Sequence, residues 1–223
     1  MEHILNHEKA HQKYFEEMTA IPHGSYHEQA YSAYLVAFAK EHGLKWIQDE
    51  LYNVIIYKDA SAGYEDHAPV LLQAHTDMVC EKNKDTDFDF EKDALKLYIE
   101  DGFLKARGTT LGADDGVGVA YMLALLSDPD AKHPPLECVF TVQEEVGLFG
   151  AMALKKEYFQ AKRMINLDDG GENATCTTSA GGVNVIMQKE RILVPHDGNG
   201  YQIDVFGLHG GHSGGEIDKE HGN

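Results

Sequence analysis

The sequence predicts an α/β domain with a mixed, mainly parallel sheet flanked by helices, followed by a second unit. Apolar segments of strand length alternate along the chain with segments of helical length, the order expected for strands joined by crossover helices. Some of the short segments are almost continuously apolar, as in strands that are covered on both faces. A small, polar stretch, ATCTTSAGG at 174–182, separates this part from residues with a different pattern.

The elements follow from local patterns. A turn at 21–28 leads into a helix that ends near Gly43, because Ser25 followed by Glu28 is typical of a capping box. The other elements of the first domain are strands at 51–57, 70–74, 137–142 and 164–167, and helices at 116–126 and 147–156.

The stretch at 174–182 is interpreted as a hinge between two domains, covering 1–182 and 183–223. Beyond it, VNVIMQKERILV and YQIDVFGLHG indicate strands of a second unit.

Composition restricts the possible partners. The chain has 223 residues and 43% hydrophobic content, enough for one core or for a domain and part of another. With 37 acidic and 19 basic residues the formal charge is −18, which disfavours nucleic acids and anionic membranes. Cationic ligands are favoured instead.

The sequence also indicates a cytoplasmic protein. Its start, MEHILNHEKA, lacks the basic and apolar regions of a signal peptide, and no later stretch reaches the roughly 18 to 20 apolar residues of a membrane span. Three widely spaced cysteines are typical of reduced thiols rather than of a disulfide framework.

Three strand-like segments run directly into residue types that bind metals. Ligands of open α/β sheets bind at the carboxyl ends of the strands, so these side chains are expected to meet at one edge. A fourth loop, GTTLGADDGVG, places acidic residues at a helix N-terminus, where negative charge is stabilised. The candidate side chains are His75 and Asp77, Asp114 and Asp115, Glu144 and Glu145, and Asp168 and Asp169.

Each of these motifs also has an ordinary explanation. A His-x-Asp sequence is often a surface pair, two adjacent glutamates are often a polar loop, and Asp115 or Asp169 alone can cap a helix. Several solvated loops need not each begin where an apolar strand ends, however. The combination therefore favours a functional site.

The ligand types indicate which ion is bound. One imidazole with several carboxylates and no clustered thiolates suits zinc, manganese or cobalt, and suits calcium less well. Two ions that share a carboxylate are expected. One of Glu144 and Glu145 can then bind a metal while the other acts as general base, and Asp77 can accept the second ring N–H of His75.

At this point the sequence resembles the dinuclear zinc peptidases, a family that includes aminoacylases, glutamate-releasing carboxypeptidases, tripeptidases and dipeptidases. Within it, the chain is most similar to the aminoacyl-histidine dipeptidases, which hydrolyse Xaa-His dipeptides of the carnosine type. The resemblance covers nearly the whole chain, in the expected order. It is carried by IPHGSYHE, LLQAHTDMVCEKN, TTLGADDGVGVA, TVQEEVGLFGA, MINLDDGGE, SAGG and GLHGGHSGGEID.

The resemblance implies a zinc-peptidase catalytic domain at 1–182, the beginning of an incomplete α+β lid and dimerisation domain at 183–223, and a homodimer. It also implies a role for each site residue. His75 binds one zinc, Asp114 bridges two, Glu145 and Asp168 each bind one, Glu144 is the general base, Asp77 orients His75, and His212 stabilises the oxyanion in a partner subunit.

Members of this family are considerably longer than 223 residues. The rest of the lid domain and a last histidine ligand are therefore expected to be absent, and Xaa-His hydrolysis is expected of the parent enzyme more than of this chain. The alternatives are an N-acyl amino acid deacylase or carboxypeptidase of the same family, or a non-catalytic metal-binding fragment. A calcium-binding protein is a more distant alternative, because the sequence has no DxDxDG loop.

Overall fold

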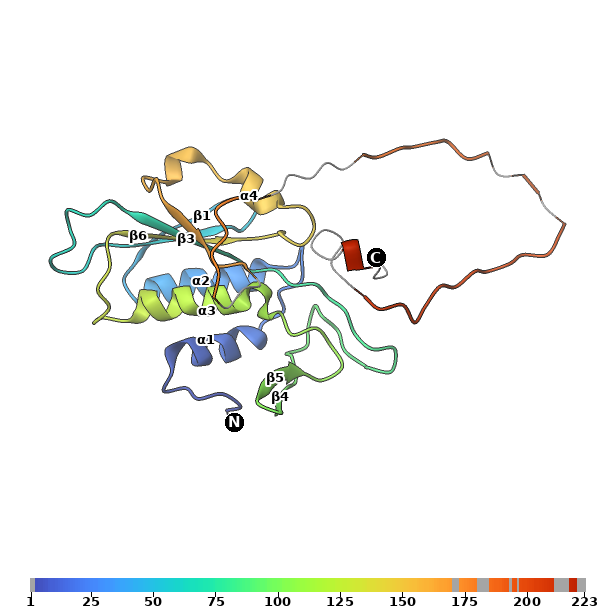
Figure 1. Ribbon diagram of the computed structural model, residues 1–223, viewed down its shortest axis with the longest axis horizontal. Helices are drawn as coiled ribbons and strands as arrows, with labels where there is room; N and C mark the ends of the chain where they lie inside the picture. Colours follow the sequence, from blue (N-terminus) through green and yellow to red (C-terminus); the bar gives the residue numbers. More distant parts are fainter. Residues whose placement is uncertain are drawn as a thin grey trace. The chain divides into compact units, whose positions relative to one another are not determined.

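The computed structural model describes residues 3–169, 173–179, 185–192, 194–195, 197–210 and 217–219. The chain divides into two units, Met1–Ala174 and Thr175–Asn223. Figure 1 shows the helices and strands of the first unit. Residues 180–184 lie outside the described part, so the domain boundary expected after residue 182 stays a prediction. Within the described residues, no helix is long and apolar enough to cross a membrane.

The first unit contains most of the regular structure. Its helices are α1 (Ala10–Thr19), α2 (Gln29–Glu41), α3 (Ala113–Ser127) and α4 (Phe149–Ala153), with a 3₁₀ turn, η1, at Lys156–Tyr158. Its strands are β1 (Lys45–Gln48), β2 (Val54–Lys58), β3 (Val70–His75), β4 (Leu97–Glu100), β5 (Phe103–Ala106), β6 (Leu136–Thr141) and β7 (Met164–Asn166). A second 3₁₀ turn, η2 (Ile217–Lys219), belongs to the second unit.

The main sheet has five strands in the order β1-β2-β6-β3-β7. Strand β3 runs parallel to both β6 and β7, whereas β1 with β2 and β2 with β6 are antiparallel pairs. Strands β4 and β5 form a separate hairpin. The predicted mixed sheet with parallel strands and flanking helices is confirmed, and the carboxyl ends of β3, β6 and β7 lie at one edge.

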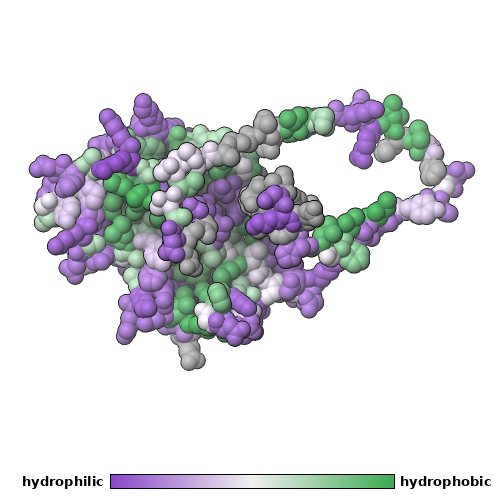
Figure 2. All heavy atoms as spheres, viewed as in Figure 1, coloured by the Kyte–Doolittle hydropathy of each residue, from purple (hydrophilic) through white to green (hydrophobic). Residues whose placement is uncertain are grey.

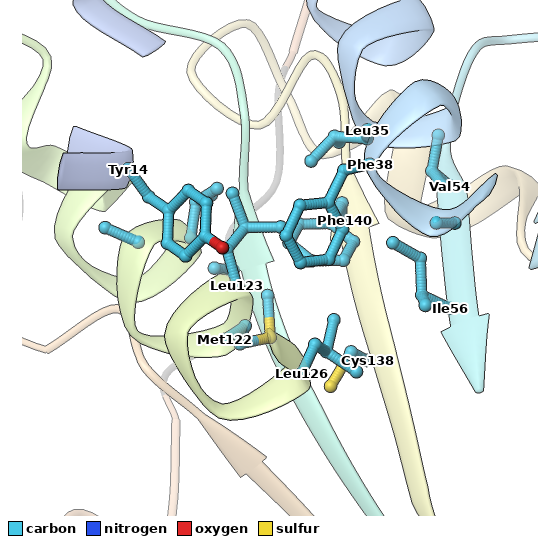
Figure 3. Packing of buried hydrophobic residues seen from close by; sticks show 14 of the residues in the cluster. Tyr14, Leu35, Phe38, Val54, Ile56, Met122, Leu123, Leu126, Cys138 and Phe140 are labelled. Atoms are coloured by element: carbon cyan, nitrogen blue, oxygen red, sulfur yellow. The ribbon is translucent and has the colours of Figure 1, made fainter. Parts of the chain in front are cut away.

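Helices α2 and α3 cover one face of the sheet, and α1 packs on α3 away from the sheet (Figure 1). Figure 3 shows side chains of these helices and of the central strands pointing toward one another. All six residues of β6 are buried, as expected for a central strand covered on both faces. Burying a side chain such as Phe140 or Leu123, both fully buried, contributes about 1.5 to 3 kcal/mol.

The predicted capping box at the start of α2 is wrong. The helix begins at Gln29, and Glu28 stands at its N-cap position without a side-chain capping bond. The Ser25 hydroxyl donates instead to the carboxylate of Asp77, at 2.7 Å. A hydrogen bond to a carboxylate is stronger than one to a backbone group, and this explains the departure from the local pattern.

Two other boundaries also differ from the prediction. The strand expected from residue 51 begins at Val54, since the Asp49 carboxylate accepts the N–H groups of Leu51 and Asn53 in a turn. The helix expected at 147–156 is shorter, because Leu154 and Lys155 have extended backbone and separate α4 from η1. The elements that were not predicted are α1, β1, β4 and β5.

The strands predicted within 183–194 and 201–210 are absent from the described residues of these ranges, so this prediction is wrong there. Strands need a hydrogen-bonded neighbour and a buried face. Apolar side chains such as Met187 and Ile203 are about 90% exposed instead. In Figure 2, green apolar residues lie between purple polar ones along this unit. Its expected α+β class stays a prediction.

Candidate metal centre

The sheet places the predicted ligands close together. His75 is the last residue of β3, and register pairs it with Thr141, the last residue of the parallel strand β6. The other neighbour of β3, strand β7, ends just before Asp168. The His75 Nε2 atom lies 3.0 Å from Asp114 Oδ1 and 3.8 Å from Asp168 Oδ2.

Two groups of three side chains could each hold a metal ion. His75, Asp114 and Glu145 form one group, and His75, Glu144 and Asp168 form the other. The ligand atoms of each group lie within 4.8 Å of one another. Both groups contain His75, so the four loops singled out in the sequence do converge. Which side chain binds which ion stays a prediction.

The imidazole of His75 has a fixed orientation. Its Nδ1 lies 2.9 Å from the backbone carbonyl of Asp77, and it must donate to this oxygen, which can only accept. The Asp77 carboxylate, which was expected to accept this N–H, lies farther away at 3.5 Å. Because Nδ1 donates to the backbone carbonyl, Nε2 is the nitrogen that faces Asp114 and Asp168, and it can bind a metal once its own proton is displaced.

The carboxylate of Asp77, which is fully buried, holds the two glutamates in place. Its oxygens accept the backbone N–H groups of Glu144 at 2.9 Å and Glu145 at 3.2 Å. The Ser25 hydroxyl is its third donor. The sequence analysis missed Ser25, whose motif was noted but interpreted as a helix cap. The carboxylate thus connects the turn before α2 to the turn after β6.

Two more buried residues hold the turn after β6. The Glu28 carboxylate accepts the N–H of Gln143 at 3.0 Å. Asn53 accepts the N–H of Val142 and donates to the carbonyl of Gly150, both at 3.0 Å. A Cβ at Gly150 would collide with the backbone of Val142, so a larger residue does not fit there. Sequence reasoning gave Glu28 only a capping role and gave Asn53 and Gly150 none, because the partners of these residues are 89 to 115 residues away.

The surrounding carboxylates favour a positive charge at His75. Burial lowers the pKa of this imidazole, but the adjacent Asp77, Asp114 and Asp168 outweigh burial and raise the pKa to about 10. The positive charge can be a proton or a metal ion. A cation that binds Nε2 must displace the proton, so metal affinity is expected to rise with pH.

The raised pKa values of two acidic residues also indicate that a cation is favoured at this centre. Burial, followed by repulsion from Asp114, raises the pKa of Asp168 to about 6. Burial and the nearby Asp168 raise the pKa of Asp115 to about 7. Asp115 Oδ1 accepts the N–H of Gly118 at the kink near the start of α3, whereas its buried Oδ2 has no hydrogen-bond partner in the described part of the chain. One imidazole, clustered carboxylates and an unpaired buried oxygen fit divalent cations.

Two of the other candidate residues have a less defined position. The side chain of Asp169 is exposed. His212 lies outside the described residues, so its predicted role at the oxyanion stays a prediction.

Known proteins resemble this chain in both sequence and structure. The sequence pattern of the peptidase family M20/M25/M40 matches residues 71–219. Cytosol non-specific dipeptidase of Escherichia coli (strain K12) is 44% identical over 211 residues, which cover 94% of this chain and 44% of that protein. This chain therefore spans less than half the length of that relative.

Two solved structures share the fold. Aminoacylhistidine dipeptidase from Vibrio alginolyticus matches with a TM-score of 0.70 and 41% identity, over 72% of this chain and 33% of that one. Aminopeptidase PepT from Bacillus cereus ATCC 10987 matches with a TM-score of 0.62 and 26% identity, over 75% of this chain and 45% of that one. Because the family pattern covers most of the sequence and includes the converging loops, the chain belongs to the peptidase family M20/M25/M40.

Proposed function

We propose that the protein catalyses metal-dependent hydrolysis of dipeptides, with Xaa-His dipeptides as its substrates. One observation carries this proposal: His75 and the carboxylates of three other loops converge where parallel strands end. The names of two relatives support the dipeptide class, since one is a non-specific dipeptidase and the other an aminoacylhistidine dipeptidase. The proposed preference for dipeptide substrates that contain histidine rests on the name of the second relative.

Two divalent ions would be held by His75, Asp114, Glu145 and Asp168. Zinc suits the mixed imidazole and carboxylate ligands, and manganese and cobalt are the alternatives. Asp114 is adjacent to both His75 and Asp168, which suits the bridging position proposed for it. When bound, such ions polarise the scissile carbonyl and lower the pKa of water.

Glu144 is proposed as the general base. Its carboxylate takes a proton from the attacking water, whose oxygen bonds to the carbonyl carbon, and passes that proton to the nitrogen as the C–N bond breaks. The backbone N–H of Glu144 donates to Asp77, so the glutamate is held beside the proposed ligands. Proton transfer requires hydrogen-bond reach, and this restraint on the backbone supports the proposed role of Glu144.

We predict that replacing Ser25 by alanine weakens zinc binding by about tenfold, the lower end of the range for residues that orient metal ligands. The variant removes a donor at 2.7 Å from Asp77, which positions the turn that carries Glu145. Zinc affinity measured by calorimetry tests this, and Ser25→Thr, which keeps the hydroxyl, is the matched control. Equal affinities for Ser25→Ala and wild type would contradict the prediction.

The substrate class is tested by incubating the zinc-loaded 223-residue protein with Xaa-His dipeptides, other dipeptides and N-acyl amino acids. We expect chelator-sensitive hydrolysis that is fastest with Xaa-His dipeptides. Faster hydrolysis of N-acyl amino acids would favour a deacylase, and hydrolysis limited to longer peptides a carboxypeptidase. Zinc binding without hydrolysis would favour a non-catalytic metal-binding chain.

The proposal extends to location and assembly. The protein is placed in the cytoplasm, which the name of the Escherichia coli relative supports. A homodimer in which His212 reaches the partner's site is also proposed, on the motif GGHSGGEID alone. A strongly acidic chain is not expected to bind nucleic acids or anionic membranes.

A further inference from the structure

A second cluster of metal-binding side chains lies at the start of the chain. It consists of His3 and His7, from the segment before α1, and Glu16, from α1 itself, and is called the His3–His7–Glu16 cluster below. Helix α1 packs on α3 on the side away from the sheet (Figure 1). The cluster shares no residue with the candidate metal centre, so it is independent of the proposed function.

The carboxylate of Glu16 is fixed by the backbone. Its Oε1 accepts the N–H of Ile4 at 3.0 Å, and its Oε2 accepts the N–H of Leu5 at 2.8 Å. Burial raises the pKa of Glu16, but these two bonds and the adjacent His7 outweigh burial and lower it below its usual value. An ionised carboxylate is therefore held in position before any cation arrives.

Both imidazoles lie beside this carboxylate. His7 Nε2 is 3.1 Å from Glu16 Oε2, and His3 Nδ1 is 3.8 Å from Glu16 Oε1. The two ring centroids are only 3.5 Å apart, with an angle of 31° between the rings. One ligand atom from each of the three side chains lies within 4.8 Å of the other two.

These distances are compatible with a single ion after a small movement. Ligand atoms around tetrahedral zinc are about 3.3 Å apart, given metal–ligand bonds of about 2.0 to 2.1 Å. The side chain of His3 is 57% exposed, so it can rotate toward the other two without disturbing the core. That exposure also leaves room for water at a further coordination position. Two imidazoles and one carboxylate suit zinc, nickel or copper rather than calcium or magnesium.

We propose that His3, His7 and Glu16 form a separate, solvent-open binding site for one zinc, nickel or copper ion. The ion would connect the segment before α1 to α1 through side chains, in addition to the backbone bonds that Glu16 already accepts. A net charge of −18 favours the approach of cations.

The site is tested by zinc calorimetry on the 223-residue protein without an affinity tag. Wild type is compared with His3→Ala, with the double variant His3→Ala/His7→Ala, and with His27→Ala as the matched control. His27 is 53% exposed and has one carboxylate, Glu91, at 3.8 Å. We expect the double variant to bind one zinc fewer per chain than wild type and His3→Ala to weaken that binding event, whereas His27→Ala binds like wild type.

A second measurement locates the ion directly. Copper is paramagnetic, and we expect it to broaden the amide NMR signals of Ile4 and Leu5 in wild type but not in His3→Ala/His7→Ala, which keeps the Glu16 backbone bonds. The proposal is overturned if the double variant binds as much zinc as wild type. It is also overturned if His27→Ala loses the same zinc, because binding would then be general to surface imidazoles.

Discussion

Replacing Glu144 by glutamine is expected to reduce kcat for dipeptide hydrolysis by about a hundredfold to ten-thousandfold, the usual contribution of a general base. Glutamine keeps the size of the side chain and the backbone bond to Asp77 but cannot accept the proton of water. Zinc content, measured by elemental analysis after dialysis, is expected to stay at the wild-type level, and KM is expected to change little.

The neighbouring glutamate provides the matched comparison. Glu145 lies in the group with His75 and Asp114, and we propose it as a ligand. Glu145→Gln is therefore expected to lower zinc content, unlike Glu144→Gln. Glu144 also lies near Asp168, in the second group. If Glu144→Gln lost zinc and Glu145→Gln kept it, the two proposed roles would be exchanged.

Much of the candidate site could be predicted because its signals are local. His75, Glu145 and Asp168 each follow an apolar strand-like segment, and the parallel pairing of β3 with β6 and β7 brings those segment ends to one edge. The strands themselves were predicted within a few residues for the same reason. A largely apolar run such as that of β6 is a strong signal in a single sequence.

The supporting network could not be predicted, because its partners are far apart in the chain. Ser25 meets Asp77 across 52 residues, and Glu28 meets Gln143 across 115. The local pattern of Ser25 and Glu28 favoured a capping box, and tertiary contacts overrode it. Strands predicted in the second unit failed for a related reason, since an alternating pattern cannot supply the neighbouring strand that would pair with it.

Replacing His75 by alanine is expected to abolish zinc binding at the candidate metal centre. His75 is the only residue present in both groups of the centre, and it supplies their only imidazole. Its loss should leave carboxylates that repel one another without a nitrogen ligand, and these bind zinc poorly. Calorimetry is expected to retain only the zinc that binds the His3–His7–Glu16 cluster.

His133→Ala is the matched control for this variant. The His133 side chain is also buried, with its Nδ1 2.8 Å from the carbonyl of Pro134, but it belongs to neither group. Both variants remove a buried imidazole, so both are expected to lower the thermal midpoint. Only His75→Ala is expected to lose the zinc of the centre. Equal zinc loss in both variants would mean that the effect comes from the fold rather than from a ligand.

The pH dependence of zinc binding separates a ligand from a merely structural histidine. The pKa of His75 is raised to about 10, so the imidazole carries a proton at neutral pH, and zinc must displace it to reach Nε2. The apparent zinc affinity of wild type should therefore rise about tenfold per pH unit between pH 6 and 8 for one displaced proton. Below about pH 6, protonation of Asp168 adds to the loss. Calorimetry in buffers of different ionisation enthalpy counts the released protons directly. If affinity did not change with pH, His75 would not exchange its proton for the ion, and its assignment as a ligand would fail.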